Sequence, residues 1–221
     1  ITMKITFANV LGNLCERIPG SDVDAITNAI GADKRISPYY LRAGLAFGGT
    51  CFPRDTKAFM TISRQFGLDP SLIEAVENVN IDQNKRLANF VRSKLGTEKK
   101  VSVLGLAFKE KTAVIEESPA IHLLQELVIE DVDVTVFDYL AIENTRMLFD
   151  DEVAYSASAE ECLQSSPVCV LTLMSEDYRR CIEAFIPNEP LIIVDCWRQL
   201  DRAKVHKDIR VIPVGGFVEA V

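Results

Sequence analysis

The apolar residues in the first half of the chain recur at the spacing expected for helices. The first apolar run stops at the breakers Pro19 and Gly20, and its members lie three or four positions apart: Phe7, Leu11, Leu14 and Ile18. Two further helices are predicted at about residues 22–31 and 54–66, each ending at a glycine. The intervening stretch, 33–53, is rich in glycine and tyrosine and is expected to form a loop.

A single long helix is predicted from about residue 70 to residue 95. Asp69 and Pro70 suit the N-cap and the first helical position, and no glycine or proline follows until Gly96. Its apolar positions are Leu72, Val76, Val79, Leu87, Phe90 and Val91. Because this length exceeds what a small helical bundle needs, the helix is expected to form a dimer seam, to connect two domains, or to do both.

The second half of the chain changes to the pattern of buried strands. Helical patterns separate most of these strands, which favours a doubly wound α/β domain with a parallel sheet and helices on both faces. The predicted strands are VSVLGLAF (101–108), DVTVFD (133–138), VAYS (153–156), VCVLTLM (168–174), LIIVDCW (191–197) and VIPVGG (211–216).

The carboxyl ends of these strands carry basic and aromatic residues. Ligands of such folds bind at this edge of the sheet, and a mixture of this kind suits a phosphorylated nucleotide. Ordinary loop residues are the alternative. No G-x-G-x-x-G follows any strand, and Gly105 stands alone, so the usual dinucleotide turn is absent from the sequence. The residues at the strand ends are Phe108, Lys109, Asp138, Tyr139, Ser175, Trp197 and Arg198.

Composition narrows the class of protein. The 221 residues are 48% hydrophobic, enough for a sizeable core, and the net charge of −8 disfavours a nucleic-acid partner. No apolar run is long enough for a membrane span, and residues 1–16 lack the features of a secretory leader. The six cysteines show no CxxC spacing and only two histidines accompany them, so a metal site is not expected. Cysteines inside apolar runs indicate a reducing, cytoplasmic setting.

The segment FGGTCFPRD, residues 47–55, contains the strongest candidate nucleophile. Cys51 directly precedes a predicted helix that begins with Arg54 and Asp55, and both a helix N-terminus and a guanidinium favour a thiolate. Asp55 could cap the helix or orient water at an acyl-cysteine. A buried loop cysteine is the alternative reading of Cys51. A thiol hydrolase would need a nearby base, but His122 and His206 are far away in sequence and lie in no motif.

The segment GGTCFPRD also resembles the active-site signature of the UDP-glucose/GDP-mannose dehydrogenase family. The resemblance extends over almost the whole chain and follows the order of the family. It includes ITFANVLGNLCE, ADKRISPYYLRAGLAFGG, AVENVNIDQNKR and KKVSVLGLAFKEKT with ESPA. It implies an enzyme that oxidises C6 of a nucleotide sugar twice, with two NAD+ reduced and no release of the aldehyde.

The resemblance also implies roles for individual residues. Cys51 would hold C6 as a thiohemiacetal and then as a thioester, which water hydrolyses, and Asp55 would serve water and base chemistry. Arg35 would reach the sugar, often across a dimer. The remaining matches are substrate contacts. Phe108 and Lys109 would hold the UDP end, and Arg198 would lie near the same site. The residues of the glycine-aromatic loop that would contact the sugar nucleotide are Tyr40, Phe47, Gly48 and Phe52.

Two departures from the family pattern limit the resemblance. Family enzymes begin with an NAD-binding domain, whereas this chain is expected to comprise a central helical dimerisation domain (1–96) and a nucleotide-sugar-binding domain (97–221). The family's catalytic lysine and asparagine would precede Lys4, which is not that lysine. In addition, Glu116 stands where many relatives have an arginine.

Several interpretations of the function remain open from the sequence alone. UDP-glucose is the favoured sugar nucleotide, with GDP-mannose and UDP-N-acetylhexosamines as alternatives. The isolated chain is expected to bind a nucleotide sugar and to dimerise through the central helices without activity of its own, because NAD would be bound elsewhere.

Overall fold

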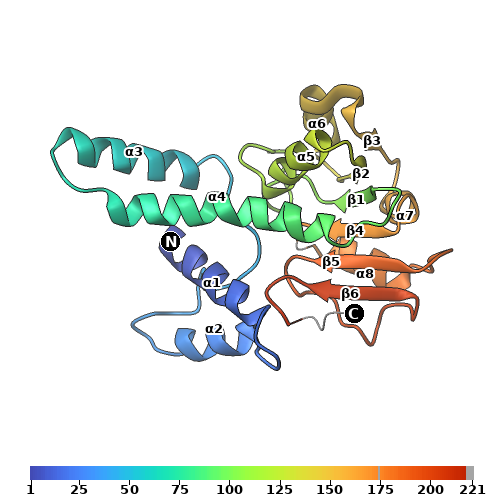
Figure 1. Ribbon diagram of the computed structural model, residues 1–221, viewed down its shortest axis with the longest axis horizontal. Helices are drawn as coiled ribbons and strands as arrows, with labels where there is room; N and C mark the ends of the chain where they lie inside the picture. Colours follow the sequence, from blue (N-terminus) through green and yellow to red (C-terminus); the bar gives the residue numbers. More distant parts are fainter. Residues whose placement is uncertain (174, 218–221) are drawn as a thin grey trace.

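The computed structural model describes residues 1–173 and 175–217. Four helices occupy the first 92 residues, and a six-stranded sheet with its covering helices occupies most of the remainder (Figure 1). The end of the predicted strand 168–174, at Met174, lies outside the described residues. Among the described residues, no helix combines the length and apolarity needed to cross a bilayer.

The four helices agree closely with the sequence pattern. They are α1 (Thr2–Cys15), α2 (Val23–Gly31), α3 (Phe52–Gln65) and α4 (Ser71–Arg92). The N-cap of α4 is Pro70 rather than the expected Asp69. The Asp69 carboxylate nevertheless accepts a hydrogen bond from the backbone N–H of Ser71 at 2.9 Å, so the capping contact is kept one residue further out.

The apolar stripe of α1 does not face the core. Phe7 and Leu14 are 48% and 54% exposed, whereas Ala8, Asn9 and Gly12 are buried. A Cβ on Gly12 would lie 3.0 Å from that of Ala43, so the helix packs tightly through its small residues. Helix α1 therefore packs against the loop at Ala43 through its small residues. Its large apolar side chains, such as Phe7 and Leu14, point away from this contact and stay exposed.

The sheet has the doubly wound architecture that the sequence predicts. All neighbouring strands are parallel, in the order β3-β2-β1-β4-β5-β6. The strands are β1 (Lys100–Leu104), β2 (Asp133–Phe137), β3 (Ala154–Tyr155), β4 (Val168–Leu171), β5 (Leu191–Asp195) and β6 (Ile209–Pro213). The helices between them are α5 (Pro119–Ile129), α6 (Ile142–Phe149) with a 3-10 turn (Asp150–Glu152), α7 (Ala159–Gln164) and α8 (Glu176–Ala184).

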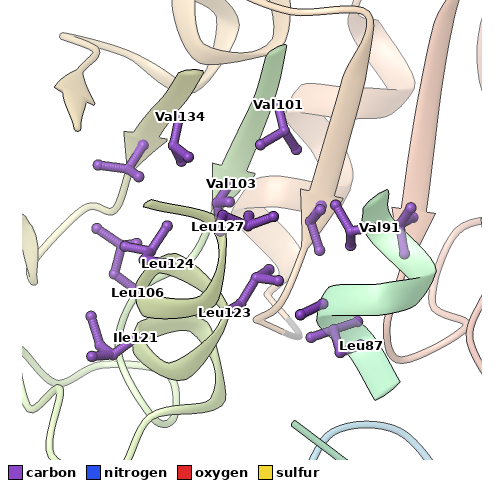
Figure 2. Packing of buried hydrophobic residues seen from close by; sticks show 14 of the residues in the cluster. Leu87, Val91, Val101, Val103, Leu106, Ile121, Leu123, Leu124, Leu127 and Val134 are labelled. Atoms are coloured by element: carbon purple, nitrogen blue, oxygen red, sulfur yellow. The ribbon is translucent and has the colours of Figure 1, made fainter. Parts of the chain in front are cut away.

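The long helix α4 joins the helical part of the molecule to the sheet. Its last turns place Leu87 and Val91 in one buried cluster with Leu123 and Leu127 of α5 and Val103 of β1 (Figure 2). Burying a side chain of this size contributes about 1.5–3 kcal/mol. Helix α4 is thus a connector, as one of the two sequence interpretations expected, and it fixes α3 and the loop before α3 relative to the sheet.

Candidate functional site

A cavity of about 600 Å³ lies where the loop of residues 40–48 meets the carboxyl ends of the sheet strands. Its volume falls within the range of about 300–1,000 Å³ that is usual for small-molecule sites. The helical part and the sheet part both contribute to its wall: Ile5, Tyr40, Arg42, Leu45, Ala46, Phe47, Gly48, Phe52, Ala107, Phe108, Lys109, Glu110, Ser118, Pro119, Ala120, Thr172, Leu173 and Trp197.

Most of the substrate residues expected from the sequence line this one cavity. Six of them meet there, although their sequence positions differ by up to about 70: Tyr40, Phe47, Gly48, Phe52, Phe108 and Lys109. Their roles in binding stay predictions. Trp197, one of the residues at the strand ends, also lines the cavity. Arg42 lines it too and was not singled out, although it lies within the matched segment ADKRISPYYLRAGLAFGG.

The wall formed by residues 44–47 is held by side-chain amides instead of by a neighbouring strand. Asn80 on α4 accepts from Phe47 N at 2.8 Å and donates to Phe47 O at 3.0 Å. Asn9 on α1 accepts from Gly44 N at 2.8 Å and donates to Leu45 O at 3.0 Å. Gln83 adds a hydrogen bond from Nε2 to Gly44 O at 2.8 Å. Because these groups are buried, the backbone has no water to replace lost partners, and the amides fix its course.

The two glycines of GGTC are required because a Cβ at either position would collide with a neighbouring group. A Cβ on Gly48 would lie 1.9 Å from Glu117 O, and one on Gly49 would lie 2.5 Å from Cδ2 of Phe108. Gly49 also has a φ of +82°, which favours glycine, and its N–H donates to Glu116 O at 3.2 Å. Thus Glu116 contacts the thiol loop through its backbone carbonyl, and Phe108 supports this loop as well as lining the cavity.

Cys51 lies at the N-terminus of α3, between the cavity-lining residues Gly48 and Phe52. It is the N-cap residue, it is exposed, and its neighbour Phe52 lines the cavity. Its Sγ lies 3.6 Å from Oγ1 of Thr50. Asp55 does not cap the helix with its side chain but accepts from the Arg54 guanidinium at 3.1 Å. The Asp55 carboxylate is therefore in the first turn of α3 and paired with Arg54, and the capping alternative for Asp55 is not what the structure has.

The largely apolar cavity wall includes three charged residues, the cations Arg42 and Lys109 and the carboxylate Glu110. Lys109 Nζ lies 5.3 Å from the centroid of the Phe108 ring. Arg42 donates from Nη2 to Trp197 O at 2.5 Å, and the Trp197 indole donates to Thr172 O at 2.7 Å. These contacts link the 40–48 loop to the end of β5. A lysine and an arginine together suit an anionic group such as a diphosphate.

Arg35 and Arg198 are not brought into this cavity. The Arg35 side chain is 89% exposed and pairs with Asp33 at 2.6 Å. The Arg198 side chain is only 10% exposed, and it donates to both carboxylate oxygens of Asp24 and to two backbone carbonyls, Ala43 O and Val214 O. Arg198 was expected in the same crevice as Phe108 and Lys109. It lies elsewhere because its guanidinium joins α2 and the 40–48 loop to the sheet.

Asp24 shows the electrostatic effect of this contact. Burial raises the pKa of the Asp24 carboxyl, but the hydrogen bonds and charge of Arg198 outweigh burial, so this pKa lies below its ordinary value. The pair is consistent with a structural role for Arg198.

The turn after β1 does not fit a dinucleotide. In dinucleotide-binding folds, the amides of this turn meet the pyrophosphate and an acidic residue after β2 meets the ribose. Here the Asp138 carboxylate instead accepts hydrogen bonds from Leu106 N and Ala107 N of that turn, at 2.7 and 3.2 Å. Its other oxygen accepts from Leu140 N and Ala141 N. The groups that would hold NAD are thus bonded to each other.

The two histidines do not support a thiol hydrolase. His122 pairs with Glu117 at 3.2 Å, and His206 lies 3.6 Å from Asp208. Neither lines the cavity. Across residues 1–173 and 175–217, three or more His, Cys, Asp or Glu side chains gather nowhere in a way that could hold a metal ion.

Comparisons with known sequences identify the family of the chain. A family profile described as "UDP-glucose/GDP-mannose dehydrogenase family, central domain" matches residues 1–82, and the same family's "UDP binding domain" matches residues 102–202. The chain is 35% identical over 203 residues to the UDP-glucose 6-dehydrogenase AglM of Haloferax volcanii, covering 91% of this chain and 47% of that protein. It is 34% identical to YwqF, a UDP-glucose 6-dehydrogenase of Bacillus subtilis, covering 78% of this chain and 40% of that protein.

Solved structures show the same likeness. A UDP-glucose dehydrogenase from Pyrobaculum islandicum superposes with a TM-score of 0.85 at 30% identity, over 98% of this chain and 48% of that one. A GDP-mannose dehydrogenase from Pseudomonas aeruginosa shares the fold with a TM-score of 0.68 at 24% identity, over 95% of this chain and 49% of that one. The chain spans about half the length of the relatives it matches.

The exposure of Cys51 predicts its reactivity among the six thiols. Cys15, Cys162, Cys169 and Cys196 are buried. Cys181 is half-buried, and burial raises the pKa of its thiol to about 12. Iodoacetamide at neutral pH should therefore alkylate Cys51 first, as measured by peptide mass spectrometry, and Cys51→Ser should remove the fast phase. Faster labelling of Cys181 or of any buried cysteine would contradict this placement of the reactive thiol.

Proposed function

The chain belongs to the UDP-glucose/GDP-mannose dehydrogenase family, and on that premise we propose that it supplies the substrate pocket and the nucleophile of an NAD-dependent UDP-glucose 6-dehydrogenase. The product is UDP-glucuronate. In this proposal residues 1–96 form the central helical unit, and residues 97–221 form the unit that binds UDP. The chain's own residues carry only the steps at the sugar nucleotide and at the thiol.

One observation carries the proposal: a single cavity has cations on its wall, and an exposed cysteine directly precedes a residue that lines it. Lys109 and Arg42 line the cavity, as does Phe52, which follows Cys51 at the start of α3. A diphosphate held by the two cations would leave the sugar to extend toward the thiol. Aromatic and apolar groups on the wall would exclude water from the reacting carbon.

The thiol chemistry follows from the C6 aldehyde that the first oxidation of the sugar produces. The Cys51 sulfur forms a bond to C6, the C=O π bond breaks, and the thiol proton passes to the C6 oxygen, giving a thiohemiacetal. The thiohemiacetal then loses the C6 hydride to the hydride acceptor and the proton of its C6 hydroxyl to solvent, which leaves a thioester. Water adds to the thioester carbon and the C–S bond breaks, giving the carboxylate, a free thiol and one released proton. Asp55, one turn into α3, would orient that water. NAD+ is the hydride acceptor that the resemblance implies. Because the turn after β1 does not fit it, none of the described residues is given a role in binding NAD+.

UDP is favoured over GDP because the matching family segment is described as UDP-binding and the curated relatives are UDP-glucose 6-dehydrogenases. GDP-mannose and UDP-N-acetylhexosamines are the competing substrates. For the 221-residue chain by itself, we propose binding of the nucleotide sugar without oxidation. A cytoplasmic location stays a prediction from the cysteines.

Calorimetry on the 221-residue chain tests the assignment of the pocket. We expect binding of UDP-glucose and UDP that is tighter than binding of GDP or NAD+. Lys109→Ala should weaken UDP binding by about 1–2 kcal/mol, between the value of an exposed ion pair and that of a charge-assisted hydrogen bond. Lys207→Ala removes an equal charge from an exposed position outside the cavity and should leave binding unchanged. Tighter binding of NAD+ than of UDP would overturn the assignment.

The covalent step can be tested without a hydride acceptor. The C6 aldehyde of UDP-glucose should form the thiohemiacetal at Cys51 and slow its alkylation by iodoacetamide, about tenfold or more beyond the shielding given by UDP-glucose itself. The alcohol serves as the matched control because it fills the same pocket but cannot add the thiol. Equal protection by the aldehyde and by UDP-glucose would remove Cys51 from the mechanism.

We also propose that two copies associate through the central helices. The exposed side chains of Met3, Phe7, Val10 and Leu14 form one face of α1. The sequence suggested Val76, Val79 or their neighbours on α4 for this seam, but Val76 is only 7% exposed within its own chain and Val79 is half-buried. Arg35, exposed and outside its own cavity, would be available to a partner copy.

The α1 face predicts the outcome of a sedimentation experiment. The chain should be a dimer at tens of micromolar, roughly the range expected for a sizeable apolar interface. The double substitution Phe7→Asp with Leu14→Asp should give monomers, because it buries two charges at the seam. Ile129→Asp changes an apolar residue that is 82% exposed on α5 and should not alter the mass. A monomeric wild-type chain would defeat the proposal.

A further inference from the structure

Lys4 makes a pair of contacts that the proposed chemistry does not use. Its ammonium on α1 donates to Ile36 O and to Ser37 O, both at 2.8 Å. These carbonyls belong to the loop between α2 and the cavity wall, more than 30 positions away in sequence. An ammonium carries three donors and no acceptor, so it suits two adjacent carbonyl oxygens that point toward one place.

The loop that Lys4 contacts has an unfavourable backbone. Ser37 and Tyr40 have φ angles of +69° and +61°. Residues other than glycine adopt this region at a cost, and they stay in it only where the surroundings hold them. The loop is also pressed against α2, since a Cβ on Gly31 would lie 2.8 Å from Cα of Pro38. The hydrogen bonds from the Lys4 ammonium to the Ile36 and Ser37 carbonyls connect this loop to α1.

The loop ends at a residue of the candidate site. Tyr40 lines the cavity and meets Phe52 edge-on, with ring centroids 6.2 Å apart. Phe52 directly follows Cys51 and lines the same cavity. The course of residues 36–40 therefore determines where the Tyr40 ring lies relative to the thiol end of the cavity.

We infer that Lys4 is a positioning residue for the sugar-nucleotide site: its ammonium latches the Ile36 and Ser37 carbonyls and so holds the Tyr40 ring on the cavity wall. Lys4 itself does not line the cavity, so it acts through the loop and not by touching the ligand. The inference rests on the proposed function only in naming the ligand, because the latch and its effect on the loop are properties of the chain alone.

Calorimetry with UDP-glucose tests the effect on binding. Lys4→Met keeps the length of the side chain without its donors and should raise Kd about tenfold, the scale of a lost hydrogen bond to a charged group. Lys4→Arg supplies two donors again and should restore Kd to within about threefold of wild type. Lys34→Met, on the same loop and exposed, removes an equal charge and should leave Kd unchanged. Equal weakening in Lys4→Met and Lys34→Met would show long-range electrostatics and overturn the latch, as would failure of Lys4→Arg to restore binding.

A double-mutant cycle tests whether Lys4 acts through Tyr40. In a Tyr40→Ala background, Lys4→Met should change Kd by less than about twofold, because the ring that the latch holds is gone. A general loss of stability would weaken binding in both backgrounds alike. A full tenfold effect in the Tyr40→Ala background would therefore overturn the positioning role.

Hydrogen exchange tests the latch without any ligand. The Leu41 N–H donates to Pro38 O at 3.1 Å, and its exchange should quicken about tenfold in Lys4→Met but not in Lys34→Met or Lys4→Arg. Exchange of the Leu41 N–H separates the Lys4 latch from the proposed binding of UDP-glucose. If wild type binds no UDP-glucose but shows this exchange pattern, the proposed function fails and the latch stands. Unchanged Leu41 exchange in Lys4→Met would overturn the latch, whatever the chain binds.

Discussion

The need to satisfy a buried stretch of backbone without a strand partner underlies the candidate site. Residues 44–47 lie beside α1 and α4, and the amides of Asn9, Asn80 and Gln83 accept from or donate to their backbone groups. Each buried group left unpaired would cost about 1–3 kcal/mol. The side chains of α1 and α4 therefore fix the backbone of residues 44–47. The GGTC loop begins directly after this segment, so its starting point is fixed as well.

The same wall is clamped from the sheet side. Gly48 lies against the Glu117 carbonyl, Gly49 lies against the Phe108 ring, and α4 shares its buried cluster with α5. The helical part and the sheet part are thus joined at the place where the cavity and the thiol lie. Asp138 completes the arrangement by holding the β1 turn with its own carboxylate. This use of Asp138 leaves a doubly wound domain whose first turn is closed to a dinucleotide, while its neighbouring edge opens onto the cavity.

Periodicity predicts the helices and the parallel sheet well because apolar burial decides both, and the position of Cys51 before a helix follows from the breakers around it. Three features are beyond sequence reasoning. The stripe of α1 faces outward because Gly12 and Ala8 allow close packing that periodicity does not register. Arg198 bonds to Asp24 across 174 positions of sequence, so spacing could not show that it lies outside the cavity. The amide clamps likewise depend on contacts between residues distant in the chain.

The most direct test of the account is a crystal structure of the chain with UDP-glucose bound. The account predicts the diphosphate beside Lys109 and Arg42, with the C6 end of the glucose within about 4 Å of the Cys51 sulfur, near the separation of reacting atoms in a productive complex. A sugar that points away from Cys51, or a ligand bound outside the cavity between the 40–48 loop and the sheet, would contradict it.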